Sequence, residues 1–91
     1  MILSTTNIND KYEVIDTVFI VHSEEAGGFL GMGGIDPDTA FNGVKTQLSK
    51  KAEELGADAV IGCDFEQRIA QTATGKQVLE VFAYGTAVKI L

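Results

Sequence analysis

Residues 36–56 read DPDTAFNGVKTQLSKKAEELG, and this stretch decides the fold because it carries a helical period. Asp36 can cap the free backbone N–H groups, and Pro37 takes the first helical position, where its missing donor is not needed. Gly56 ends the helix, since glycine adopts the left-handed conformation of a helix C-terminus without strain. Apolar residues recur every three or four positions and so share one face of the helix: Phe41, Val44, Leu48, Ala52 and Leu55.

Strands are predicted on both sides of this helix. Segments 2–6 and 12–22 precede it, and the second is rich in β-branched and aromatic residues. Segments 59–72 and 78–90 follow it and form a hairpin around the turn at residues 74–75. The element order is therefore β-β-α-β-β. This order predicts an α+β domain with one amphipathic helix packed on one face of a mainly antiparallel sheet.

The two faces of this sheet are both apolar. Residues 18–21 read VFIV and residues 81–84 read VFAY, so apolar side chains project from both sides of these strands. A single helix covers one side only. A second copy of the chain is the simplest cover for the other side, which predicts a homo-oligomer.

Length and composition narrow the class of protein further. The 91 residues are expected to form a single domain spanning 1–91. A formal net charge of −6 opposes both nucleic acid and an anionic membrane surface as partners. No secretion signal or membrane span is visible, and the lone Cys63 excludes a disulfide within the subunit. We therefore expect a cytoplasmic protein whose partner is itself.

Three blocks of residues carry a family resemblance. They are Ser4-Thr5-Thr6, the block LGADAVIG at 55–62 and the block GTAVK at 85–89. In this order they resemble the YbjQ-like family, also labelled heavy-metal-binding domains. The resemblance implies small β-β-α-β-β subunits that assemble as rings, typically homopentamers, without an agreed activity. This chain differs in one place, because the short glycine-rich loop 26–35 stands where typical members carry a longer helical segment.

Cys63 is the first candidate ligand. In the alternation Ala59, Ile61, Cys63, Phe65 it shares an apolar face, which favours a small buried hydrophobe. The alternative is a soft ligand for copper, zinc or a selenium species. Small archaeal selenium-binding proteins are similar in size and in having a single cysteine. Burial and the neighbouring Asp64 are both expected to raise the thiol pKa, which opposes a redox nucleophile.

His22 and Glu24 are the second candidate. They share a face where the strand continues, so one imidazole and one carboxylate could chelate zinc or nickel. Two ligands do not close a site, but symmetry-related copies could add more. The alternative is a solvated strand end.

Other polar and glycine-rich features favour no specific chemistry. The loop 26–35 lacks both common phosphate-binding patterns, so nucleotide binding is not expected. Carboxylates in or beside the strands are interpreted as a charged rim, with Arg68 and Lys76 as ion-pair partners, and acid–base catalysis is the alternative. These carboxylates are Asp16, Asp58, Asp64, Glu66 and Glu80.

Three hypotheses for function follow. The first is a non-catalytic homo-oligomer that binds a small ligand or a heavy metal, with copper or zinc at Cys63, His22 and Glu24. The second is a structural ring without a small-molecule ligand. The third is an enzyme with a site between subunits.

Overall fold

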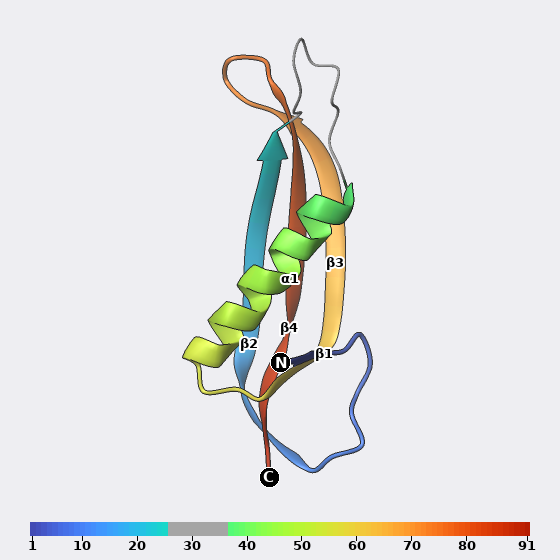
Figure 1. Cartoon of the computed structure of the whole chain (residues 1–91), viewed down its shortest axis with the longest axis vertical. Coiled ribbons are helices and arrows are strands. Elements are labelled where there is room, and N and C mark those ends of the chain that lie inside the picture. Colours follow the sequence, from blue (N-terminus) through green and yellow to red (C-terminus); the bar gives the residue numbers. More distant parts are fainter. Residues whose placement is uncertain (26–36) are drawn as a thin grey trace.

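The computed structural model describes residues 1–25 and 37–91. Within these ranges the elements are β1 (Ile2–Leu3), β2 (Tyr12–Glu25), α1 (Pro37–Glu54), β3 (Ala59–Gln71) and β4 (Gln77–Ile90). The predicted β-β-α-β-β order and α+β class are confirmed. In Figure 1, α1 runs diagonally across one face of the long strands. The glycine-rich loop and the capping residue Asp36 lie outside the described residues.

The sheet has the strand order β1-β3-β4-β2, so β4 is central and β2 forms an edge. β4 pairs antiparallel with both β2 and β3, whereas β1 pairs parallel with β3. The prediction of a mainly antiparallel sheet is confirmed. β1 is shorter than the predicted strand 2–6. After Leu3 the chain turns along β3, where Ser4 N–H donates to the Val60 carbonyl and the Ser4 carbonyl accepts from Cys63 N–H.

A β-bulge in β3 overturns the predicted alternation around Cys63. Ile61 pairs with Thr86 and Asp64 pairs with Tyr84, so Gly62 and Cys63 together face a single residue of β4. Gly62 adopts a φ of 60°, which suits glycine at such a bulge. The extra residue shifts the period, and Cys63 therefore faces α1 rather than sharing a face with Ile61. A strict period of two could not anticipate this shift.

The main core lies between α1 and the sheet. The helix contributes Ala40, Val44, Leu48 and Ala52, all fully buried, and Phe41 packs at its margin. The predicted face is thus confirmed for Phe41, Val44, Leu48 and Ala52. Leu55 is the exception: it is 41% exposed, because α1 ends at Glu54 and the chain leaves the helical period there. Gly56 has a φ of 82°, as expected for the residue that ends the helix.

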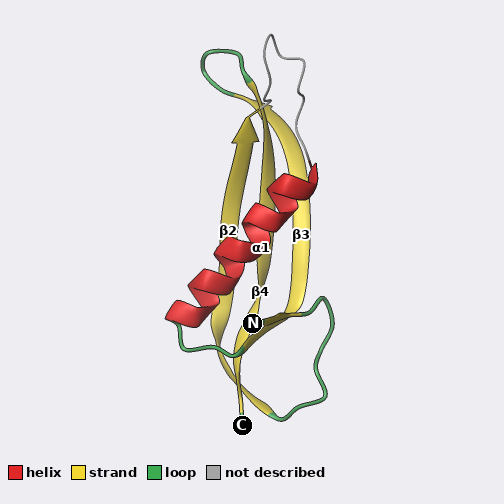
Figure 2. Ribbon diagram, in the orientation of Figure 1, coloured by secondary structure: helices red, strands yellow, loops and turns green. Residues whose placement is uncertain are grey.

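Among residues 1–25 and 37–91, the N-terminal segment covers one end of the sheet face opposite α1. Figure 2 shows α1 on a single face of the sheet. On the other face, Ile8 and Tyr12 of the N-terminal segment pack on a small second cluster formed by Ala59, Ile61 and Val88.

Beyond that cluster, the same face carries Phe19, Val21, Phe82 and Tyr84, and we call these residues the open face. Phe19 pairs with Tyr84 and Val21 pairs with Phe82 across the two strands. Phe19 is 62% exposed and Val21 is 47% exposed. Residues 18–21 and 81–84 therefore do place apolar groups on both faces, as their sequences predict.

Candidate functional site

His22 lies near the end of β2, on the face that carries the helix. Its Nε2–H donates to Glu24 Oε1 at 2.7 Å, and its Nδ1 accepts from the Gln47 side-chain amide at 2.6 Å. The alternation of the strand places His22 and Glu24 on the same face, as the sequence predicts. Gln47 comes from α1 and was not predicted. The three side chains form a polar cluster at the junction of β2 and α1.

Gly43 makes room for this cluster on the helix. A Cβ atom at residue 43 would lie 2.8 Å from His22 Nε2 and 2.9 Å from Cε1, both closer than real side chains allow. The imidazole thus packs directly on the helix backbone. Glycine inside a helix costs roughly 1 kcal/mol relative to alanine. This cost was the sequence signal that could have pointed to a close contact at Gly43.

The pair of donors fits a metal ion in part. The imidazole Nε2 and a carboxylate oxygen are ordinary ligands of borderline metals. In this structure they are joined by a hydrogen bond of 2.7 Å, which an ion would have to replace. The side chains are partly accessible, with 16% exposure for His22 and 33% for Glu24. Gln47 donates to the second ring nitrogen, whereas the outer neighbours of histidine ligands accept from that nitrogen's N–H, so the Gln47 amide would have to turn when a metal binds. Water or another subunit must complete the coordination.

Cys63 lies elsewhere and is bound into the core. The side chain is 5% exposed, and its Sγ donates to the Val60 carbonyl at 3.6 Å. Burial raises the pKa of the Cys63 thiol and outweighs the backbone hydrogen bonds, which lower it. Gly85 packs beneath it: a Cβ there would lie 2.7 Å from Val60 Cγ1 and 3.3 Å from the Cys63 sulfur. These contacts support the interpretation of Cys63 as a buried apolar residue.

The two candidate sites are too far apart to share an ion within one subunit. His22 pairs with Val81 on one side of β4, and Cys63 lies opposite Gly85 on its other side. Four residues along β4 and two strand spacings separate them by about 16 Å. Within residues 1–25 and 37–91, no three His, Cys, Asp or Glu side chains converge on a possible metal position. A metal at His22 therefore has two protein ligands from this part of the chain.

Carboxylates on the open-face side of the sheet make ordinary structural contacts. Glu80 pairs with Arg68 at 3.2 Å, as predicted, and the Arg68 guanidinium also lies over the Phe82 ring. Asp64 Oδ2 accepts from the Tyr84 hydroxyl at 3.0 Å. This hydrogen bond, together with the negative charge of Asp64, raises the pKa of Tyr84. The contacts agree with the charged-rim interpretation.

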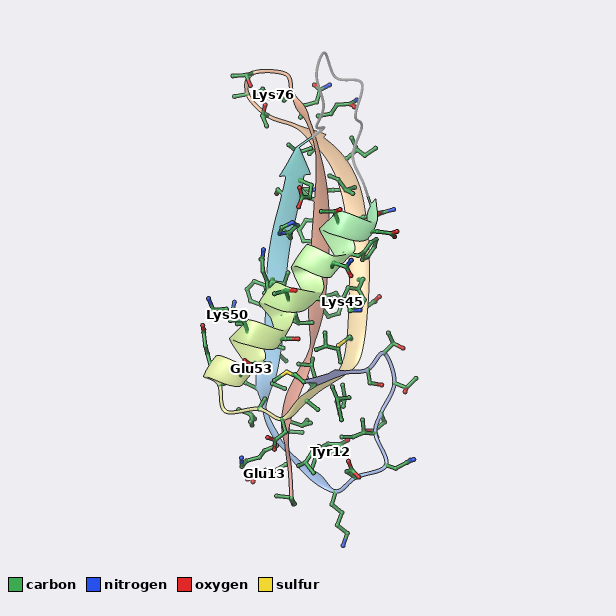
Figure 3. The ribbon with its side chains drawn as sticks, viewed as in Figure 1. Tyr12, Glu13, Lys45, Lys50, Glu53 and Lys76 are labelled. Carbon is green, nitrogen blue, oxygen red and sulfur yellow. The ribbon has the colours of Figure 1, made fainter. Side chains whose placement is uncertain are left out.

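The outer side of α1 is polar. Lys45, Lys50 and Glu53, labelled along the helix in Figure 3, are all exposed. Within the described ranges, no helix has both the length and the apolar character needed to cross a lipid bilayer.

Comparison with known proteins places the chain in a family. The model of a family described as "Putative heavy-metal-binding", YbjQ_1, matches residues 38–91. The chain belongs to this family. A UPF0145 protein of Pseudothermotoga lettingae is 36% identical, and the alignment covers 99% of this chain and 97% of that protein. A UPF0145 protein of Fervidobacterium nodosum is 33% identical, with 99% and 95% covered.

A solved structure supports the same assignment. The crystal structure of a DUF74-family protein of unknown function from Pediococcus pentosaceus matches with a TM-score of 0.78 and 25% identity. The match covers 100% of this chain and 98% of that one. The alignment with the Pseudothermotoga protein spans 107 positions, more than the 91 residues of this chain. This excess agrees with the expectation that typical members of the YbjQ-like family carry a longer segment.

Proposed function

We propose that this protein is a non-catalytic homo-oligomer that binds a transition-metal ion through His22 and Glu24. The observation that carries the proposal is the donor pair itself: an imidazole nitrogen and a carboxylate oxygen 2.7 Å apart and partly accessible. The family description points to the same class of ligand. Open coordination positions suit an ion that is taken up and passed on, since structural sites are usually closed by four protein ligands.

The groups with raised pKa values support a non-catalytic role. The Cys63 thiol is buried, and the Tyr84 hydroxyl is held by a carboxylate. Raising the pKa of either group keeps it protonated at neutral pH, so neither is prepared to act as a nucleophile or a base. The burial of Cys63 also opposes a selenium carrier that depends on this thiol.

Self-association is the second part of the proposal. The open face leaves Phe19 and Val21 largely in water, in a domain too small to be very stable alone. Arg68 and Glu66 of β3 lie beside the open face and carry opposite charges. A border with both charges favours contact with another protein subunit. Leu55 and Ile69, on the helix-covered side, are also exposed. A ring requires two different contact surfaces, and we propose the open face as one of them. We favour five subunits, the ring implied by the family resemblance.

Two measurements test this function. Isothermal titration of nickel(II) into protein purified without a metal-affinity tag should show binding that His22→Ala abolishes and Cys63→Ser retains. If His22→Ala still binds nickel normally, the site is elsewhere. An oligomer that binds no metal would instead support the structural ring.

The assembly is tested with Phe19→Asp. This change should lower the sedimentation mass without unfolding the subunit, because Lys51 Nζ lies 4.6 Å from the Phe19 ring and can pair with the new carboxylate. An unchanged mass would show that the open face is not the interface.

A further inference from the structure

Within the described residues β2 pairs with β4 alone, so its other side forms an outer edge of the sheet. Unpaired backbone N–H and C=O groups along such an edge can pair with a strand of another chain. We infer that Lys51 and Asp16 block strand addition at the middle of this edge, so that a second copy of the chain docks on the open face and does not extend the sheet. The inference rests on the self-association in the proposed function and specifies which surface takes part.

Contacts at Thr17 and Phe19 show which backbone groups of β2 point outward. The Thr17 N–H donates to Asp16 Oδ1 at 2.8 Å, and the Phe19 carbonyl accepts from Lys51 Nζ at 3.0 Å. In an antiparallel pair, the N–H and C=O of one residue point to the same side of the strand, and this side alternates along the chain. Thr17 and Phe19 are two residues apart and therefore share a side. Because their partners are side chains rather than β4, this is the outward side, and an added strand would find these two groups occupied.

Lys51 reaches the edge from the last turn of α1. The C-terminal half of this helix lies over β2 in Figure 1, and the neighbouring Ala52 is fully buried against the sheet. Lys51 Nζ also lies 4.6 Å from the centre of the Phe19 ring, so the ammonium group has two contacts at this point. A strand that pairs with Phe19 would have to displace the ammonium group or remove it from water, and both cost free energy.

The opposite edge of the sheet has the same kind of contact. Beyond the two residues that β1 covers, this edge is formed by β3 within the described residues. Asp64 Oδ1 accepts from the Phe65 N–H at 2.9 Å, as Asp16 does for the residue that follows it. Two residues before Phe65, the Cys63 N–H donates to the Ser4 carbonyl. Occupied backbone groups on both edges favour self-association through a face of the sheet over association through its edges.

The test removes both contacts at β2 in the double variant Lys51→Met with Asp16→Ala, called the edge variant, whose net charge equals that of wild type. Lys50→Met with Asp10→Ala, at exposed residues of the same types, is the matched control. Each protein is incubated at the same concentrations and followed by thioflavin T fluorescence and sedimentation velocity. The edge variant should form about tenfold more thioflavin-positive aggregate than wild type or the control. Its soluble fraction should keep the wild-type sedimentation mass, because the open face is intact.

Two additional variants separate the edge from general stability. Gly85→Ala is expected to destabilise the subunit at the bulge, away from the edge of β2, and should aggregate less than the edge variant. Lys51→Arg keeps a charged donor and should stay as soluble as wild type. An edge variant that aggregates no more than Gly85→Ala, or whose soluble mass falls below that of wild type, would overturn the inference. A monomeric wild type would refute the proposed self-association and the docking on the open face, whereas the aggregation comparison would still test the block at β2 alone.

Discussion

Replacing Gly43 by alanine tests the close contact between α1 and His22. Glycine in a helix interior is normally destabilising, so alanine alone should add roughly 1 kcal/mol to the free energy of unfolding. Here the new Cβ would lie 2.8 Å from His22 Nε2, and the imidazole must move. Its hydrogen bonds to Gln47 and Glu24 then lengthen or break.

The opposing contributions can be compared in size. Each lost hydrogen bond costs about 1 kcal/mol net, so the pair contributes about 2 kcal/mol. Subtracting the gain in helix propensity leaves Gly43→Ala destabilising by about 1 kcal/mol. In a His22→Ala background the clash and both hydrogen bonds are absent. There the same substitution should stabilise by about 1 kcal/mol, giving a coupling energy of about 2 kcal/mol between the two sites.

Urea denaturation followed by circular dichroism measures all four proteins of this cycle. Protein concentration must be held equal, since self-association adds to apparent stability. If Gly43→Ala stabilises the protein equally with and without His22, the two residues are not coupled. The packing of His22 on α1 would then be refuted.

Three further predictions concern the sheet. Gly85→Ala should reduce the free energy of unfolding by about 1–3 kcal/mol in the same assay. The new Cβ would lie 2.7 Å from Val60 Cγ1 and 3.0 Å from the Ile61 carbonyl oxygen. An unchanged free energy of unfolding would contradict the packing at the bulge. The raised pKa of Cys63 means that protonation favours the folded state. The buried thiol therefore contributes its full share to the free energy of unfolding below its ordinary pKa of 9.0, and this share is lost as the pH rises further. The difference in unfolding free energy between wild type and Cys63→Ala should fall above about pH 9. A difference that stays constant with pH would exclude this effect of thiol ionisation on stability. Arg68→Ala should change subunit stability by less than about 1 kcal/mol, because this ion pair is exposed on the Arg68 side; a larger loss would place Arg68 in a subunit contact.

The elements of the fold were predictable because their signals are local. The helix from Pro37 to Glu54 follows from its apolar period and from Gly56, and the hairpin follows from two β-rich runs around Gly75. The parallel pairing of β1 with β3 was not predicted. It depends on contacts between segments far apart in the sequence, such as Ser4 with Val60, and no local pattern encodes them.

The candidate site was predictable in part for the same reason. His22 and Glu24 lie two residues apart on one strand, so alternation alone places them together. Gln47 and Gly43 belong to a different element, and their approach to His22 depends on how α1 crosses the sheet. The predicted face of Cys63 was wrong, because the bulge at Gly62 breaks the alternation on which that prediction relied.

Native mass spectrometry of the tag-free protein, recorded with and without added nickel(II), tests the central claim most directly because it counts subunits and bound ions together. We predict a multi-subunit complex that gains up to one nickel per subunit. The His22→Ala protein should form the same complex without the added mass. A monomer, or a wild-type complex that takes up no nickel, would contradict the proposal of a metal-binding homo-oligomer.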